Sequence, residues 1–212
     1  MATKNATITG KLTAEMVART ALRLLDDLGL DGLTMRQVAK QLDVQVAALY
    51  WHVKNKQQLL NVMATIMITE AFDGLEAPRR GITWDAWVAD LAQRLRRSML
   101  HYRDGARVLA GTTITDPLLL RTTELTLRTL HDAGFAIDDA ARSFPTLLHY
   151  AIGYTIEEQA RIEAGPPEPI DTSRYPLTTE AAGELSAPDT DANFEHGLRL
   201  ILAGMRTTHL PT

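Results

Sequence analysis

Apolar residues between positions 34 and 60 fall into two short helical patterns that meet at a tight turn. In each pattern the apolar side chains recur at helical spacing, so each segment predicts a short helix with one inward face. The inward residues are Val38, Ala39 and Leu42 in the first segment and Val46, Leu49 and Tyr50 in the second. This pattern is typical of a helix-turn-helix, whose second helix enters the major groove of DNA.

The remaining apolar residues also recur at helical spacing, and no segment alternates as a strand does. Residues that cap helices, such as Thr34 and Asn55, stand before several of these segments. Two long amphipathic helices are predicted near residues 137–164 and 191–206. Between them, residues 165–190 carry five prolines and few large apolar side chains, which predicts a mobile loop with a helical turn near residues 178–185. The predicted fold class is all-α.

Composition narrows the class of protein further. The 212 residues include no cysteine, which excludes disulfides and thiolate metal sites and fits a cytoplasmic location. We find no signal peptide and no run of about 20 apolar residues, so we expect no membrane partner. The net charge is -4, yet the first 60 residues hold eight Lys and Arg against five Asp and Glu. This local excess of positive charge suits phosphate neutralisation, although a solvated helix face would give the same imbalance.

Polar and aromatic residues in and just after the second helix of the motif can contact DNA. Glutamine hydrogen-bonds base edges, and an alanine methyl contacts a thymine methyl. Tyrosine, histidine and lysine suit phosphate oxygens, which fix register without reading sequence. The candidates are Gln45, Ala48, Tyr50, Trp51, His52, Lys54 and Lys56. The alternative is a structural three-helix unit in which Tyr50 and Trp51 are core aromatics.

The order of the residues adds a resemblance to a known family. The segments GLDGLTMRQVAKQLDV and LYWHVKNKQQLL resemble the helix-turn-helix and the start of the fourth helix in the TetR family of bacterial repressors. The likeness continues in HYRDGARVLAGT (101–112), in AGF (133–135) and in the run from Gly153 to Gln159. It is nearest to the tetracycline-repressor branch of that family and covers nearly the whole chain.

The resemblance implies two domains and a homodimer. A three-helix DNA-binding domain would cover residues 1–56, and a helical ligand-binding and dimerisation domain would cover residues 57–212. The helices near 137–164 and 191–206 would form a four-helix bundle with those of a second subunit. Two-fold symmetry suits a palindromic operator in double-stranded DNA, with half-sites about 34–36 Å apart. The alternative is that both helices are buried within one monomer.

The resemblance also extends the set of DNA contacts. Thr34 and Arg36 match positions that contact phosphates and bases, although Arg36 alone could equally be a surface cation on an amphipathic helix. Val46 and Ala48 replace a polar residue and a threonine of the tetracycline-repressor branch, whereas Tyr50 matches it. We therefore expect the same docking on phosphates with a changed base preference, leaning towards thymine methyl groups.

Several helices around an apolar centre form a natural cavity for a small-molecule effector. The resemblance places its walls at Phe72, Leu91, Leu95, Leu109, Thr112, Thr113, Ile114, Thr126, His149 and Glu157. His149 and Glu157 would be two of its few polar groups. The alternatives are a core or interface histidine at His149, and a solvated helix face at Glu157 and Glu158.

Three of these residues depart from the tetracycline-repressor branch. Leu109 stands where that branch has a magnesium-ligating histidine, and a leucine cannot bind a metal. Phe72 and Leu91 replace a histidine and an asparagine that hydrogen-bond the drug, and apolar walls penalise each unpaired hydroxyl by roughly 1–3 kcal/mol. We therefore expect no metal or other cofactor, and an antibiotic or metabolite that is largely apolar rather than magnesium–tetracycline.

Two rival functions remain open from the sequence. An enzyme would use His149 as a base with Glu157 as its partner, but no nucleophile elbow, phosphate-binding glycine loop or zinc-spaced pair accompanies them, so we expect no catalytic residues. A DNA-binding protein that has lost ligand control would keep the helix-turn-helix alone. The favoured prediction is a ligand-responsive repressor released from its operator by a small effector.

Overall fold

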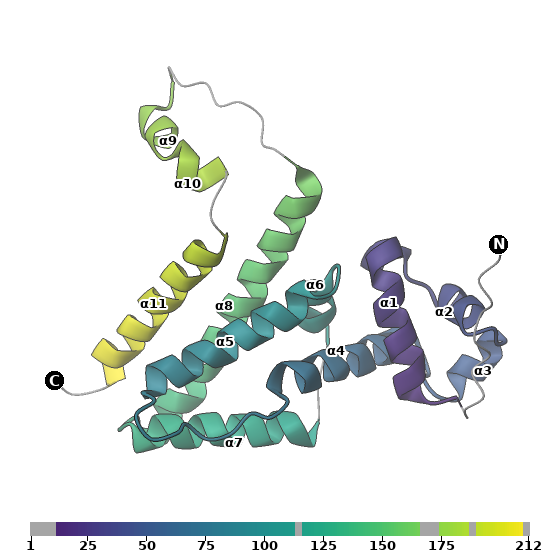
Figure 1. Cartoon of the computed structure of the whole chain (residues 1–212), viewed down its shortest axis with the longest axis horizontal. Helices are drawn as coiled ribbons and strands as arrows, with labels where there is room; N and C mark the ends of the chain where they lie inside the picture. The colour runs from purple at the N-terminus through teal and green to yellow at the C-terminus, as the bar shows by residue number, and fades with distance from the viewer. Residues whose placement is uncertain (1–11, 113–115, 166–173, 187–189, 210–212) are drawn as a thin grey trace. The chain divides into compact units, whose positions relative to one another are not determined.

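The computed structural model describes residues 12–112, 116–165, 174–186 and 190–209, and every regular element within these ranges is a helix (Figure 1). The helices are α1 (Ala14–Gly32), α2 (Met35–Gln41), α3 (Val46–Tyr50), α4 (Lys56–Phe72), α5 (Trp84–Leu100), α6 (Gly105–Ala110), α7 (Pro117–Asp132), α8 (Ile137–Ala164), α9 (Pro176–Glu180), α10 (Ala182–Ser186) and α11 (Thr190–His209). The all-α prediction is confirmed. None of the described helices has the length and hydropathy that crossing a membrane requires.

The chain divides into two compact units, and the first comprises Met1–Asp73 with Ser98–Leu119. Within it α1 lies beside α4, and α2 meets α3 at a turn (Figure 1). Helix α1 begins because the Thr13 side chain accepts a hydrogen bond from the backbone N–H of Met16. Its regular course stops at Gly29, where φ is 64°, a conformation that favours glycine.

The predicted inward faces of α2 and α3 are confirmed in part. Val38, Ala39, Leu42 and Leu49 are buried, but Val46 is only half-buried and Tyr50 is exposed. The reason is the length of α3: a helix of five residues makes little more than one turn, so few of its side chains can face the core. Leu49 occupies the inward position, and Val53, four residues later, is also fully buried. The core side chains of this unit include Leu22, Leu25, Leu49, Leu59, Met63 and Met67.

The second unit comprises Gly74–Arg97 with Leu120–Thr212, and α8 packs along α11 in it. Helix α8 has the predicted limits, and Gly165 with φ 76° follows its last residue. Phe144, Leu147 and Ala151 are buried, as expected for its inner face. The helical turn predicted near residues 178–185 is confirmed, and it forms two short helices, α9 and α10. Residues 166–173 and 187–189 lie outside the described residues.

Candidate DNA-reading surface and ligand-binding residues

The helix-turn-helix is shaped by local hydrogen bonds at both ends of α2. Thr34 is the N-cap: its hydroxyl accepts from the backbone N–H of Gln37 at 3.3 Å, and the Gln37 side chain accepts from the backbone N–H of Thr34 at 3.0 Å. At the other end Asp43 has φ 54°, a left-handed conformation that aspartate tolerates better than most residues, and the predicted tight turn is confirmed. The backbone N–H of Val44 donates to the carbonyl of Ala39 across that turn.

The surface of α3 and of the residues just after it is polar, aromatic and exposed. Leu49 and Val53 are completely buried, so they fix the segment in the unit's core. Gln45 is exposed, Tyr50 is 47% exposed and Trp51 is 88% exposed. The alternative in which Tyr50 and Trp51 are core aromatics is therefore wrong.

The cations around α3 differ in their surroundings. Arg36 and Lys54 are exposed, and the backbone N–H of Lys54 donates to the Gln58 side chain at 2.6 Å. Lys56 is half-buried, and its ammonium group donates to the carbonyl of Leu30 at 3.0 Å. Lys56 therefore ties the start of α4 to the end of α1, in addition to any contact with phosphate. His52 is half-buried beside these residues in the chain.

Asp104 holds the end of α1 against the turn before α6, a contact that the sequence did not indicate. Its carboxylate accepts from the backbone N–H of Leu30 at 2.7 Å and from Arg107 at 2.9 Å. Burial raises the pKa of Asp104, but the hydrogen bonds from Leu30 and Arg107 outweigh it and hold the pKa below its usual value. Arg107 also binds Asp31. Leu30 and Asp104 are 74 residues apart, so no local pattern could reveal the pair.

Three predicted ligand-binding residues lie in the first unit. Phe72 in α4 and Leu109 in α6 are buried, as expected for cavity walls. Thr112 is half-buried, and its hydroxyl donates to the carbonyl of Leu109 at 2.8 Å, which leaves its oxygen free to accept from another group. Thr113 and Ile114, also predicted here, lie outside the described residues. These positions remain predictions.

Five others lie in the second unit, and their surroundings differ sharply. Leu91, Leu95 and Thr126 are buried, and the Thr126 hydroxyl donates to the carbonyl of Thr122. His149 is exposed on α8, so the expectation of a core histidine fails within this unit.

Glu157 of α8 is exposed too, whereas the adjacent Glu158 is buried and bound to Arg96. The solvated helix face expected for both acids therefore holds for Glu157 and is wrong for Glu158.

The same placement weakens the enzyme hypothesis. His149 and Glu157 stand eight residues apart on one helix, which separates their backbones by about 12 Å along the axis. Side chains of that length at that spacing do not form the hydrogen bond that a base and its partner need.

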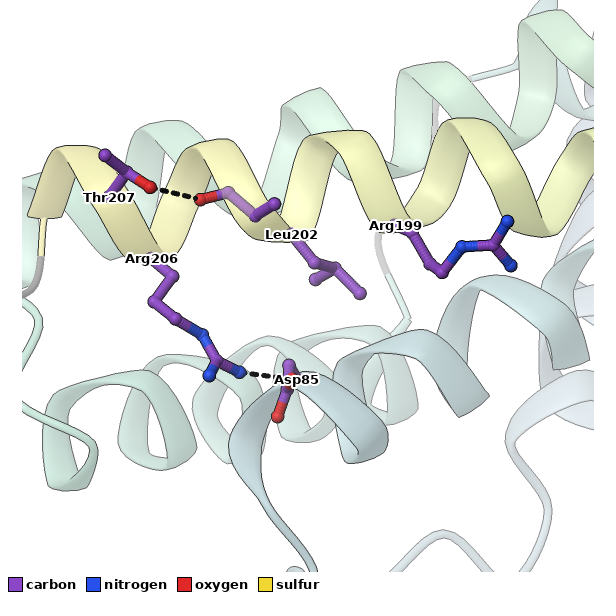
Figure 2. Close-up of a pocket in the computed structure, with 6 residues that line it drawn as sticks. Asp85, Arg199, Leu202, Arg206 and Thr207 are labelled. Atoms are coloured by element: carbon purple, nitrogen blue, oxygen red, sulfur yellow. Dashed lines mark hydrogen bonds and ion pairs between the residues drawn. The ribbon is translucent and has the colours of Figure 1, made fainter.

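The described residues of the second unit border two surface grooves whose linings include none of the predicted ligand-binding residues. The first has a volume of about 340 Å³ and lies between α11 and the start of α5, where Arg206 pairs with Asp85 (Figure 2). Burial raises the pKa of Asp85, yet hydrogen bonding to Thr83 and the charge of Arg206 bring it below its usual value. The second, of about 310 Å³, is bordered by Pro78, Ile82 and Trp84 with residues of α7.

Comparison with known proteins assigns the N-terminal and C-terminal parts of the chain to the same family. Residues 18–63 match the family described as bacterial regulatory proteins, tetR family, and residues 77–209 match the tetracyclin repressor-like C-terminal domain. The tetracycline repressor protein class C of Escherichia coli is 38% identical over 209 residues, which cover 95% of this chain and 94% of that protein.

Solved structures give the same result. A possible TetR family transcriptional regulator from Streptomyces coelicolor A3(2) is 38% identical, with a TM-score of 0.85 over 92% of this chain and 100% of that one. ActR from Streptomyces coelicolor, in complex with actinorhodin, is 29% identical with a TM-score of 0.81 over 95% of this chain and 99% of ActR. The chain belongs to the TetR family of helix-turn-helix DNA-binding repressors, which carry a ligand-binding C-terminal domain and are not enzymes.

Proposed function

We propose that this repressor binds a palindromic operator as a homodimer and is released by a small, largely apolar effector. The observation that carries the DNA-binding part is the exposed aromatic and polar surface around α3, in which Trp51 is 88% exposed beside the fully buried anchors Leu49 and Val53. Selection of binding sites from random duplexes, followed by titration with the protein, tests this DNA-binding function. A repressor should enrich one two-fold symmetric sequence.

The contacts around α3 divide into those that read bases and those that bind the backbone. Gln45 caps the start of α3, Val46 and Ala48 lie on the helix, and all three suit base edges and thymine methyl groups. Tyr50, Trp51, His52, Lys54 and Lys56 follow at the end of the helix and after it and suit phosphates. The N-cap of α2, Thr34, and Arg36 on α2 supply further contacts to phosphates and bases. Apolar Val46 and Ala48 give this protein an operator unlike that of the tetracycline repressors.

Replacing Trp51 with alanine should weaken operator binding about tenfold while leaving the fold intact. The indole is almost fully exposed, so its removal should change the free energy of unfolding by no more than about 0.5 kcal/mol. Fluorescence anisotropy with a labelled operator measures the first effect, and urea unfolding measures the second. Leu177→Ala, a change at another highly exposed apolar side chain, is the control and should alter neither. Unchanged operator affinity in Trp51→Ala would contradict the assignment.

The homodimer is supported by apolar surface that α8 and α11 leave uncovered. Leu148, Ile152 and Ile156 recur every four residues on α8 and are only half-buried, next to the buried inner face. On α11, Ile201 is half-buried and Leu200 is 62% exposed. A second copy of the chain would cover this surface, which favours the homodimer over the monomer alternative.

The apolar effector is supported by the chemistry of the predicted walls. Phe72, Leu91, Leu95 and Leu109 are buried and offer no hydrogen bond, so they favour a flat apolar body. The Thr112 and Thr126 hydroxyls already donate within the chain and retain acceptor capacity, which suits an effector with one or two donor groups. The complex of ActR with actinorhodin supports small-molecule control in a similar protein.

Release follows from differential affinity of the effector for two shapes of the repressor. A useful response needs a coupling free energy of about 1–3 kcal/mol, or roughly 5- to 150-fold in operator affinity. A protein without ligand control would bind the same operator and show no such change with any compound. That outcome would support the alternative of a constitutive DNA-binding protein.

A further inference from the structure

A cluster of charged and aromatic residues around the buried Arg96 joins α5, α8 and α11 in the second unit. Arg96 is only 7% exposed and is the one Lys or Arg among the buried residues of the described part of the chain. Its Nε and Nη2 donate to the two carboxylate oxygens of Glu158 at 2.9 and 2.6 Å, and its Nη1 donates to Asp191 at 2.7 Å. Its guanidinium lies over the rings of Phe194 and Tyr154, at 4.9 and 5.9 Å. We call these five residues the Arg96 cluster.

The cluster holds the first turns of α11 at defined points along α8. The Tyr154 hydroxyl donates to the carbonyl of Thr190 at 2.9 Å, and the Tyr150 hydroxyl donates to the carbonyl of Phe194 at 2.8 Å. Tyr150 also occupies the space that a side chain at position 197 would need, so Gly197 permits this close approach. Burial raises the pKa of Tyr150 to about 12, so its hydroxyl keeps its proton as a donor at neutral pH.

Stability alone is a weak reason to place an arginine here. A buried ion pair loses the hydration of both charges, and apolar residues of similar volume often stabilise a fold as well or better. The attested advantage of such a pair is that it specifies one arrangement of helices among several. Here the guanidinium binds one acid on α8 and one on α11 in directions fixed by its planar geometry.

The outward face of α11 depends on the rotation of that helix. Successive residues differ by about 100° around the axis, so a slip by one residue would turn Leu200 away from its present direction. Phe194, Leu198 and Leu202 would leave the inner face together. A fixed pairing of α8 with α11 therefore fixes the surface that a second copy would meet.

We propose that Arg96 is a positioning residue for the homodimer: it sets the rotation of α11 against α8 and thereby shapes the surface on which the second copy docks. This inference rests on the proposed homodimer. It assigns to Arg96 an effect on association between chains that is separable from its effect on the folding of each chain.

The test compares three variants of the full chain by sedimentation over a range of concentrations, with urea unfolding at several protein concentrations to separate dissociation from unfolding. Arg96→Met leaves Glu158 buried without its partner and should lower both chain stability and dimer affinity. The double variant Arg96→Met with Glu158→Met removes both charges. It should recover chain stability while its dimer stays about tenfold weaker than that of the unaltered protein. Arg96→Lys keeps the charge without the planar fork and should also dimerise more weakly.

Two further changes keep the inference testable if the double variant does not fold. Asp191→Asn removes one arm of the cluster at a side chain that is 81% exposed, so it should fold normally and still dimerise severalfold more weakly. Arg97→Met is the matched control, because Arg97 is 63% exposed and its ion pair with Asp90, at 3.8 Å, lies within α5. It should leave the dimer unchanged.

The possible outcomes separate this inference from the proposed function. If the double variant or Asp191→Asn forms a dimer as tight as the unaltered protein, Arg96 has no positioning role and the inference is overturned. If the unaltered protein is itself monomeric at every concentration, the proposed homodimer is wrong and the inference falls with it. A weakened dimer in both variants, beside an unchanged Arg97→Met, supports the inference.

Discussion

Replacing Leu200 with glutamate is expected to abolish dimer formation and to lower operator affinity by about 1,000-fold or more, to the level of non-specific DNA binding. Leu200 is 62% exposed on α11, so the single chain should fold as before. In a two-fold dimer, however, each glutamate would be buried in the interface without a partner charge. Each would face apolar side chains of the second copy. One helix-turn-helix can then occupy only half of a palindromic site.

The matched control is Leu120→Glu, because Leu120 is a leucine of similar exposure, 72%, on α7 rather than on α8 or α11. Sedimentation gives the oligomeric state of each variant, circular dichroism shows whether it folds, and anisotropy with the operator gives its affinity. A dimeric Leu200→Glu variant with unchanged operator binding would exclude α11 from the interface. Loss of the dimer in Leu120→Glu would indicate that the interface includes α7.

Replacing Gly105 with alanine is expected to lower the free energy of unfolding by about 3 kcal/mol, the upper range for overpacking a filled interior. A Cβ atom at Gly105 would overlap the backbone carbonyl oxygen of Met99 and would lie 3.1 Å from the Cε of Met67. A flexible side chain could move away, but a carbonyl at the end of α5 cannot do so without moving the turn. That turn also contains Asp104, which has φ 57° and binds Leu30.

Gly183→Ala is the control for that variant, since no atom lies within 4 Å of the corresponding Cβ. It should keep or slightly raise the stability, because alanine favours helix more than glycine does. Urea unfolding of both variants at one protein concentration gives the comparison. If Gly105→Ala were as stable as the unaltered protein, the turn before α6 would be more adaptable than its contacts indicate.

Features set by neighbouring residues could be predicted from the sequence. The start of α2 at Thr34 and of α4 at Asn55 depends on caps that bond three residues ahead, and both are confirmed. The left-handed turn at Asp43 is equally local. The limits of α8 follow from a long apolar period and from Gly165 after its end.

Features set by distant residues could not be predicted. Arg96 binds Glu158 from 62 residues away, and nothing near either residue distinguishes the pair. The resemblance pointed to Glu157 as a polar group of the ligand cavity, and the sequence did not indicate that the adjacent Glu158 is the buried acid. One residue along a helix means a turn of about 100°, which is the difference between solvent and core. The exposure of Tyr50 differs from expectation because α3 is too short to bury a second large side chain beside Leu49.

The most direct test of the account is an anisotropy titration of one selected palindromic operator with the unaltered protein, repeated with added compounds. We expect two chains to bind each duplex, and a flat apolar compound with one or two hydrogen-bonding ends to weaken binding tenfold or more, at about 1.4 kcal/mol. Magnesium–tetracycline should have no effect, because Leu109, Leu91 and Phe72 offer it no ligand or hydrogen bond. Binding of one chain per duplex, or release by magnesium–tetracycline alone, would contradict the account.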